Sequence, residues 1–203
     1  VVVNAGLKPQ SYTTCDEFKN DPGEPEVEPG QYVSVAIEAL DDGYGETRLS
    51  REKAKRRAAG QALREHAPDL VVLTGDFCDH LPQLLPALRA VESIAPRLGS
   101  YAVFGNHEYY RGARSALRTY AKTEIEVINQ SHRTLGVGSA RLCLVGVDDP
   151  VSLRRPDYFA HATDRALSAA PSDAFHLGLS HRPQGFEQLA DQGVRLTLSG
   201  HTH

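Results

Sequence analysis

The sequence predicts a fold of the α/β class, in which strands and helices alternate along the chain. Three observations favour this class. Short apolar runs of strand length recur, amphipathic segments of helix length separate them, and several runs, such as residues 70–73, are apolar throughout. A continuous apolar run is typical of a strand covered on both faces. The length of 203 residues favours one compact domain.

Residues 1–30 differ in texture from the rest of the chain. They contain four of the twelve prolines and six acidic residues against two lysines, and no period of 2 or 3.6 is visible. We therefore predict an irregular acidic lead-in over residues 1–30 and a globular domain over residues 31–203.

The elements of the globular part follow from the position of each apolar run. Strands are predicted at residues 32–37, 70–73, 101–104, 141–147, 175–179 and 195–198. Helices are predicted where small or apolar residues recur at helical spacing, at residues 50–66 with Ser50 as N-cap, 83–94, 113–122, 163–169 and 186–192.

Composition excludes several classes of protein. The formal net charge of −4 argues against a dedicated nucleic-acid binder, and no apolar run has the roughly 18 residues of a membrane span. Three scattered cysteines make neither a disulfide scaffold nor a thiolate zinc site. Because no methionine is present, even at position 1, we expect a processed chain or a fragment, so that an N-terminal membrane anchor stays conceivable. The compartment is left open, with a cytoplasmic or membrane-peripheral bacterial location favoured.

Four polar motifs each follow the end of a predicted buried strand. They are Gly75-Asp76-x-x-Asp79, Gly105-Asn106-His107-Glu108, Ser180-His181 and Gly200-His201-Thr202-His203. Ligands of open α/β sheets collect just beyond the carboxyl ends of the strands, so these side chains can converge. Carboxylate, amide and imidazole donors together favour a divalent metal, and one carboxylate can bridge two ions that clamp a phosphate ester.

Each motif also has an ordinary interpretation as a turn, a helix cap or a single polar residue, and it is their joint occurrence that favours a metal site. Arg182, beside His181, could contact a phosphate, although a purely structural role is the simpler interpretation. Tyr109 and Tyr110 could line the site or pack in the core.

This set of motifs resembles that of the calcineurin-like metallophosphoesterase superfamily. The stretches around Asp76, Asn106 and His201 are most similar to its bacterial membrane-associated phosphodiesterase branch, which is related to hydrolases of UDP-2,3-diacylglucosamine. The resemblance covers roughly residues 31–203. It implies an α/β/β/α sandwich with a dinuclear metal site at one sheet edge, here without the C-terminal strands of the family.

The resemblance also implies a role for each matching residue. Asp76 would bridge two ions, Asn106, His181 and His201 would complete one metal site, and His203 would belong to the other. His107 would stabilise the phosphate or act as general acid, Glu108 would hold His107, and Asp79 would orient ligands. The ions would be Mn, Fe, Zn or Ni, with Mn favoured.

One departure from the family pattern concerns the first metal site. The family opens with a strand followed by Asp-x-His, whereas Ala39 and Asp41 occupy these positions here. Either the first site is crippled, or Asp41 or Asp42 substitutes as an oxygen ligand, or the anomaly marks an error or engineering within residues 1–45.

Two functions follow from these observations. The leading hypothesis is a metal-dependent phosphoesterase in which a metal-bound water or hydroxide attacks a phosphodiester or pyrophosphate, a nucleotide-lipid being one candidate substrate. The alternative is a degenerate scaffold with an incomplete metal site that binds without turnover. No nucleic-acid partner is expected.

Overall fold

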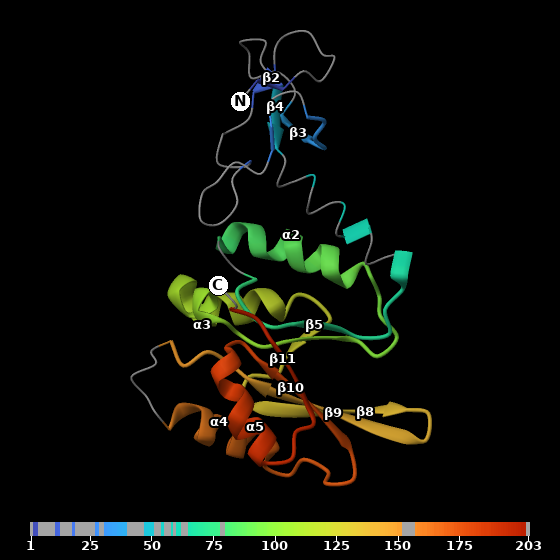
Figure 1. Ribbon diagram of the computed structural model, residues 1–203, viewed down its shortest axis with the longest axis vertical. Coiled ribbons are helices and arrows are strands. Elements are labelled where there is room, and N and C mark those ends of the chain that lie inside the picture. The colour runs from blue at the N-terminus through green and yellow to red at the C-terminus, as the bar shows by residue number, and fades with distance from the viewer. Residues whose placement is uncertain are drawn as a thin grey trace. The chain divides into compact units, whose positions relative to one another are not determined.

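The protein is described from a computed structural model (Figure 1). The structure describes residues 2–3, 11–12, 18, 27–28, 31–39, 47–50, 54, 58, 60–61, 65–77, 80–151 and 157–201. The chain divides into two compact units, Val1–His66 and Ala67–His203. The expected boundary between residues 30 and 31 stays a prediction. No helix among these described residues has both the length and the apolar character that crossing a bilayer requires.

The first unit contains a small four-stranded sheet in the order β1-β2-β4-β3. Its strands are β1 (Val2–Val3), β2 (Ser11–Tyr12), β3 (Ala36–Ala39) and β4 (Thr47–Ser50). Two of these strands lie within residues 1–30, for which the sequence predicted irregular structure. Ser50, expected to be an N-cap, ends β4 as a buried strand residue, although residues 54, 58, 60–61 and 65–66 are helical as predicted.

The second unit contains two further sheets. One has the order β5-β6-β7, with all strands parallel, and the other has the order β11-β10-β9-β8. In the latter β9, β10 and β11 are parallel and β8 is antiparallel to β9. The strands are β5 (Val71–Leu73), β6 (Ser100–Ala102), β7 (Ile125–Val127), β8 (Ser131–Val137), β9 (Ala140–Val147), β10 (Phe175–Ser180) and β11 (Leu196–Ser199).

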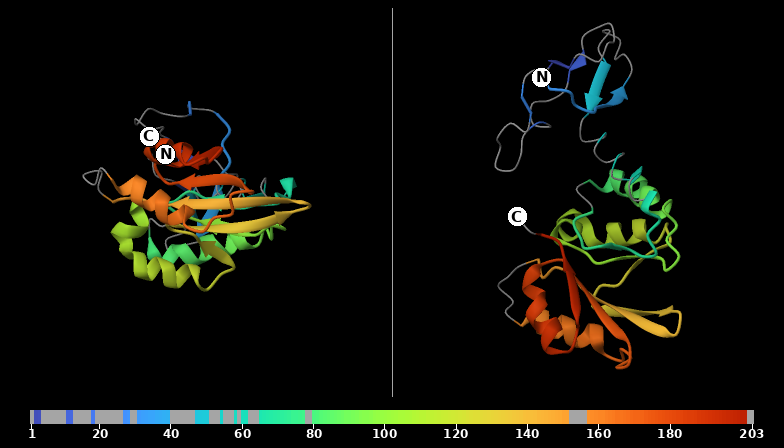
Figure 2. Two further views of the ribbon diagram at one scale, coloured as in Figure 1. Left: turned by 90° about the horizontal axis from the view of Figure 1, so that it is seen from below. Right: turned by 45° about the vertical axis from the view of Figure 1, so that its right-hand side comes forward.

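In the second unit, helices cover the outer face of each of the two sheets, as Figures 1 and 2 show. They are α2 (Leu81–Glu92), α3 (Asn106–Tyr120), α4 (Tyr158–Leu167), the 3-10 helix η2 (Pro183–Gly185) and α5 (Phe186–Asp191). Helix α3 begins seven residues before its predicted start at residue 113.

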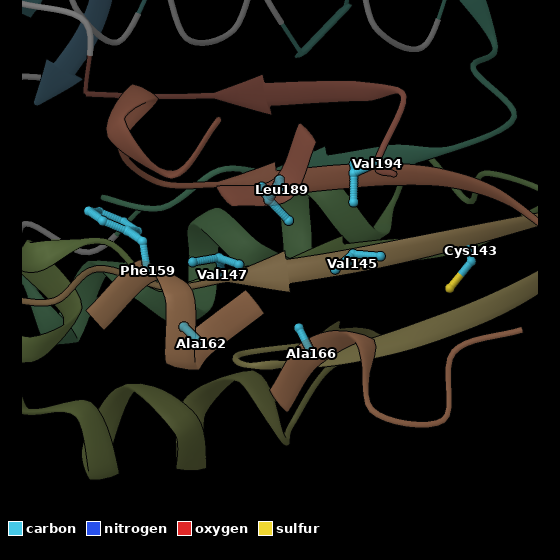
Figure 3. Close-up of a cluster of buried hydrophobic side chains, with 8 residues drawn as sticks. All are labelled: Cys143, Val145, Val147, Phe159, Ala162, Ala166, Leu189 and Val194. Carbon is cyan, nitrogen blue, oxygen red and sulfur yellow. The ribbon is translucent and has the colours of Figure 1, made fainter. Parts of the chain in front are cut away.

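Three apolar clusters show that these elements form four layers. The first cluster packs α2 and α3 against the β5-β6-β7 sheet through residues such as Leu88 and Ala102. The second lies between the two sheets, with Val103 and Leu144 among its members. The third packs the other sheet against α4 and α5 (Figure 3). The predicted α/β/β/α sandwich is therefore confirmed.

Strand β9 illustrates why a continuous apolar run was the right signal for a buried strand. Its side chains alternate between two faces, because successive residues of a strand point in opposite directions. Cys143 and Val145 face α4 and α5, and Leu144 faces the other sheet. All three are fully buried, so both faces had to be apolar.

The carboxyl ends of the parallel strands meet at one edge of the sandwich, and backbone hydrogen bonds join those of β6, β9, β10 and β11 there. The Asp149 N–H donates to the Phe104 carbonyl at 3.0 Å, which links the two sheets. Within the second sheet, His181 N–H donates to the Val147 carbonyl at 3.2 Å and Gly200 N–H to the His181 carbonyl at 3.1 Å. The described residues of the four polar motifs lie at this edge.

Candidate metal centre

Two loops that follow β5 and β6 touch each other closely enough to require glycine. A Cβ atom on Gly75 would lie 2.6 Å from the Gly105 nitrogen, and one on Gly105 would lie 2.6 Å from the Asp76 nitrogen. Gly75 and Asp76 both have positive φ values, of 97° and 56°. Aspartate and asparagine tolerate this left-handed conformation better than most residues. The local backbone therefore explains both glycines and the aspartate at position 76.

Glu108 locks the two loops together from the first turn of α3. Its carboxylate is fully buried and accepts the N–H groups of Asp76 at 3.0 Å, Phe77 at 2.7 Å and Gly105 at 2.8 Å. Burial raises the pKa of Glu108, against the lowering effect of these N–H groups. We expected Glu108 to hold His107. The role that its contacts support is to fix the backbone on which Asp76 and Asn106 are placed.

His181, at the end of β10, is only 1% exposed, and one hydrogen bond fixes its tautomer. Its Nδ1 lies 2.7 Å from the Thr74 carbonyl oxygen. Because a carbonyl only accepts, Nδ1 carries the hydrogen, and the neutral ring has its lone pair on Nε2. A backbone acceptor on the second ring nitrogen is the usual arrangement for a metal-binding histidine.

Oxygen atoms surround that lone pair. His181 Nε2 lies 3.1 Å from Asn106 Oδ1, 3.4 Å from Asp76 Oδ2 and 3.9 Å from Asp149 Oδ2. A nitrogen lone pair among oxygen acceptors is repulsive unless a positive charge, either a proton or a metal ion, lies between them. The donor set therefore fits a divalent cation.

His201 brings a second imidazole to the same place. Its Nδ1 lies 3.7 Å from Asp76 Oδ2, and its ring centroid lies 5.0 Å from that of His181. One donor atom from each of Asp76, His181 and His201 lies within 4.8 Å of the others. These are three of the six ligands expected from the sequence, and Asn106 Oδ1, which touches His181, is a fourth.

The remaining predicted site residues fall into two groups. His107, half-buried on α3, donates its backbone N–H to Asp76 Oδ1 at 3.0 Å, and its ring centroid lies 6.4 Å from that of Tyr110. Asp41, Asp79 and His203 lie outside the described residues, so their roles stay predictions.

Asp148 and Asp149, directly after β9, are buried acidic residues that the sequence analysis missed, and Asp149 borders the candidate metal centre. Both are 1% exposed. Asp149 accepts a hydrogen bond from Arg182 Nε and lies beside His181. Asp148 accepts from the Tyr109 hydroxyl, from Tyr158 Oη at 2.7 Å and from Gln130 Nε2 at 3.0 Å. The only signal in the sequence was a pair of consecutive acidic residues after an apolar run. The proline that follows them makes the segment look like an ordinary turn, and so this signal is easily overlooked.

Tyr109 gives a test of this buried network. Replacing Tyr109 by phenylalanine keeps the ring that packs edge-on against Phe104 but removes one donor to the Asp148 carboxylate. We expect the free energy of unfolding in urea to fall by about 1.5–3 kcal/mol, as for a hydrogen bond to a charged group. Tyr110, 63% exposed, is the matched control, and Tyr110→Phe should change stability by less than about 0.5 kcal/mol. Equal effects of the two substitutions would contradict this description of Asp148.

Comparison with known proteins matches most of this chain to a known family. Residues 50–203 match the family described as calcineurin-like phosphoesterase. The "Transmembrane protein with metallophosphoesterase domain" of Danio rerio is 31% identical over 160 residues, which cover 74% of this chain and 36% of that protein. The structure of Haemophilus influenzae NAD nucleotidase aligns with a TM-score of 0.52 and 17% identity, over 72% of this chain and 32% of that one. At such low identity this likeness shows the fold alone.

A relative of a different kind matches a shorter stretch. The small ribosomal subunit protein bS1 of Neisseria meningitidis serogroup B is 52% identical over 75 residues, which cover 37% of this chain and 13% of that protein. The chain thus spans about a third or less of the length of each of these three proteins. The family match begins at residue 50, after Asp41 and after the strand predicted at 32–37.

Proposed function

The chain belongs to the calcineurin-like phosphoesterase family, and from that premise we propose that it hydrolyses a phosphodiester or a pyrophosphate with the help of divalent metal ions. The observation that carries the proposal is the convergence of Asp76, His181 and His201 from three separate strand ends. When bound, divalent ions would supply Lewis-acid stabilisation of the phosphoryl oxygens and an acidic water as nucleophile.

The residues of the chain would divide the remaining work. Asp76 would bridge two ions, and Asn106, His181 and His201 would complete one of the two sites. His203 would serve the other, with Asp41 as a candidate substitute ligand there. Oxygen-rich ligation of that kind favours manganese. Glu108 would keep Asp76 and Asn106 in register through the backbone N–H groups that it accepts.

His107 would act on the substrate and not on the metal. Its backbone N–H, which every residue except proline would keep at this position, donates to Asp76 Oδ1, and its ring would stabilise the phosphate or protonate the leaving oxygen. We expect His107→Ala to lower the rate of bis(p-nitrophenyl) phosphate hydrolysis with Mn²⁺ by about 10²-fold or more. Mn²⁺ affinity, measured by calorimetry, should not change. His161, exposed on α4, gives the control variant His161→Ala. Full activity of His107→Ala would refute this role.

A second candidate function is a degenerate metallophosphoesterase scaffold that binds a ligand without turnover. It is favoured by one observation, namely that the opening Asp-x-His of the family has no counterpart at Ala39 and Asp41, which precede the matched residues. Counting metal ions per chain separates the two functions. A value near two, with turnover, supports the hydrolase, whereas one or none without turnover supports the binding scaffold.

We propose that the substrate is a small phosphate ester, and the specific candidate is a nucleotide-lipid. Its support is the similarity of the motifs to the membrane-associated phosphodiesterase branch, together with the transmembrane relative from Danio rerio. Association with a membrane is part of the same proposal. Hydrolysis of a nucleotide-lipid in vesicles faster than of bis(p-nitrophenyl) phosphate would support it, and no hydrolysis of the lipid would contradict it.

A further inference from the structure

An ion pair lies at the border of the candidate metal centre. Arg182 follows His181 directly, and its Nε donates to Oδ2 of Asp149, at the end of the neighbouring strand. The same oxygen lies 3.9 Å from His181 Nε2. The guanidinium and the candidate ligand imidazole therefore have one carboxylate oxygen as a common neighbour.

Asp149 is held rigidly enough to orient its partner. Its side chain is completely buried, its N–H donates to the Phe104 carbonyl, and its Oδ1 accepts the Val151 N–H. The Arg182 side chain keeps 13% of its surface exposed. A guanidinium has five N–H groups, and the bond to Asp149 uses the one on Nε, which leaves the four on the two Nη atoms outside this bond.

We propose that Arg182 is a phosphate-binding residue, oriented by Asp149 so that its Nη groups donate to the non-bridging oxygens of the substrate phosphoryl group beside His181. A planar guanidinium matches the oxygens of a phosphate, and a charge-assisted pair is stronger than a neutral hydrogen bond. This inference rests on the proposed function. It adds to the metal ions a second positive charge on the substrate phosphate, which the protein itself supplies.

The competing explanation is that Arg182 only neutralises a buried carboxylate, because an unpaired buried charge is strongly destabilising. Two variants separate the explanations. Arg182→Gln removes the guanidinium and leaves Asp149 unpaired. The double variant Asp149→Asn with Arg182→Gln removes both charges together, so that no unpaired buried charge destabilises the fold.

The measurement is the affinity of the Mn²⁺-loaded protein for inorganic phosphate, by titration calorimetry, alongside KM for bis(p-nitrophenyl) phosphate. We expect both variants to bind phosphate about 10- to 100-fold more weakly than the original protein, and their KM to rise by a similar factor. Calorimetry with Mn²⁺ alone shows whether the metal group is intact in the double variant.

Recovery of the original phosphate affinity in the double variant would overturn the proposal, and so would an original protein that binds no phosphate. Failure of the proposed function has a different signature. If the protein binds phosphate through Arg182 but hydrolyses no ester, the binding inference stands and the hydrolase proposal fails. If it hydrolyses esters and the loss of Arg182 changes neither KM nor phosphate affinity, only the inference about Arg182 fails.

Discussion

Replacing Asp76 by asparagine should weaken Mn²⁺ binding and slow phosphoester hydrolysis, each by more than about a hundredfold. Asp76 supplies the negative charge of the group that it forms with His181 and His201, and losing even an outer partner of a metal site costs about 10- to 100-fold. Asparagine keeps the size of the side chain and tolerates the positive φ of 56° at this position. The loss would therefore be one of charge and not of backbone conformation.

The control for this variant lies at the other end of the same strand. Asp69 precedes β5, and its side chain is 67% exposed and paired with Arg97. Since exposed ion pairs contribute little, Asp69→Asn should leave Mn²⁺ affinity and turnover unchanged. Titration calorimetry with Mn²⁺ and initial rates with bis(p-nitrophenyl) phosphate measure both quantities. If Asp76→Asn binds Mn²⁺ as tightly as the control does, Asp76 is not a ligand.

Replacing Glu108 by alanine should lower the free energy of unfolding by about 3 kcal/mol or more. The substitution leaves the N–H groups of Asp76, Phe77 and Gly105 without their buried acceptor, and each unsatisfied buried group costs about 1–3 kcal/mol. Glu108→Gln should cost less, because one amide oxygen can still accept the two N–H groups that bind Oε2 in the native protein.

Glu187 is the matched control, since it is an exposed glutamate in the first turn of another helix, α5. We expect Glu187→Ala to change stability by less than about 1 kcal/mol, the range of a charge at a helix N-terminus. Urea unfolding measures all three variants. A Glu108→Ala protein as stable as Glu187→Ala would mean that the two loops do not depend on this carboxylate.

The sequence was sufficient to predict strands that are buried on both faces. Residues 70–73 and 142–147 are continuous apolar runs, and the structure places β5 (Val71–Leu73) and β9 (Ala140–Val147) over them. Strands β7 and β8 were missed because neither is a continuous apolar run. The three residues of β7 include a glutamate, and β8 begins with four polar residues at the partly exposed edge of its sheet. Short segments of this kind are easily mistaken for loops.

The start of α3 was missed for a different reason. Asn106 and His107 look like a turn in sequence, and Gly112, with a φ of 111°, interrupts the helix. What begins the helix at Asn106 is the side chain of Glu108, which accepts the Gly105 N–H. The same carboxylate holds Asp76 and Phe77, 31 or 32 residues away, and no local pattern predicts such a contact.

The side chains of the candidate metal centre could be predicted from the sequence because they follow the ends of strands, and the topology of a parallel sheet brings strand ends together. Asp148 and Asp149 could not be predicted in this way. Their importance depends on partners such as Tyr158 and Arg182, which approach from other elements. Alignment of residues 32–37 with the opening strand of the family was a weaker inference, since the family match begins at residue 50.

The most direct test of the account is anomalous scattering from crystals of the protein grown with Mn²⁺. We predict a manganese peak bounded by Asp76 Oδ2, His181 Nε2 and His201 Nδ1, whose mutual distances already suit a common ion. The number of peaks would also decide between two ions and one. Crystals that contain Mn²⁺ elsewhere on the protein but none among these three side chains would contradict the account.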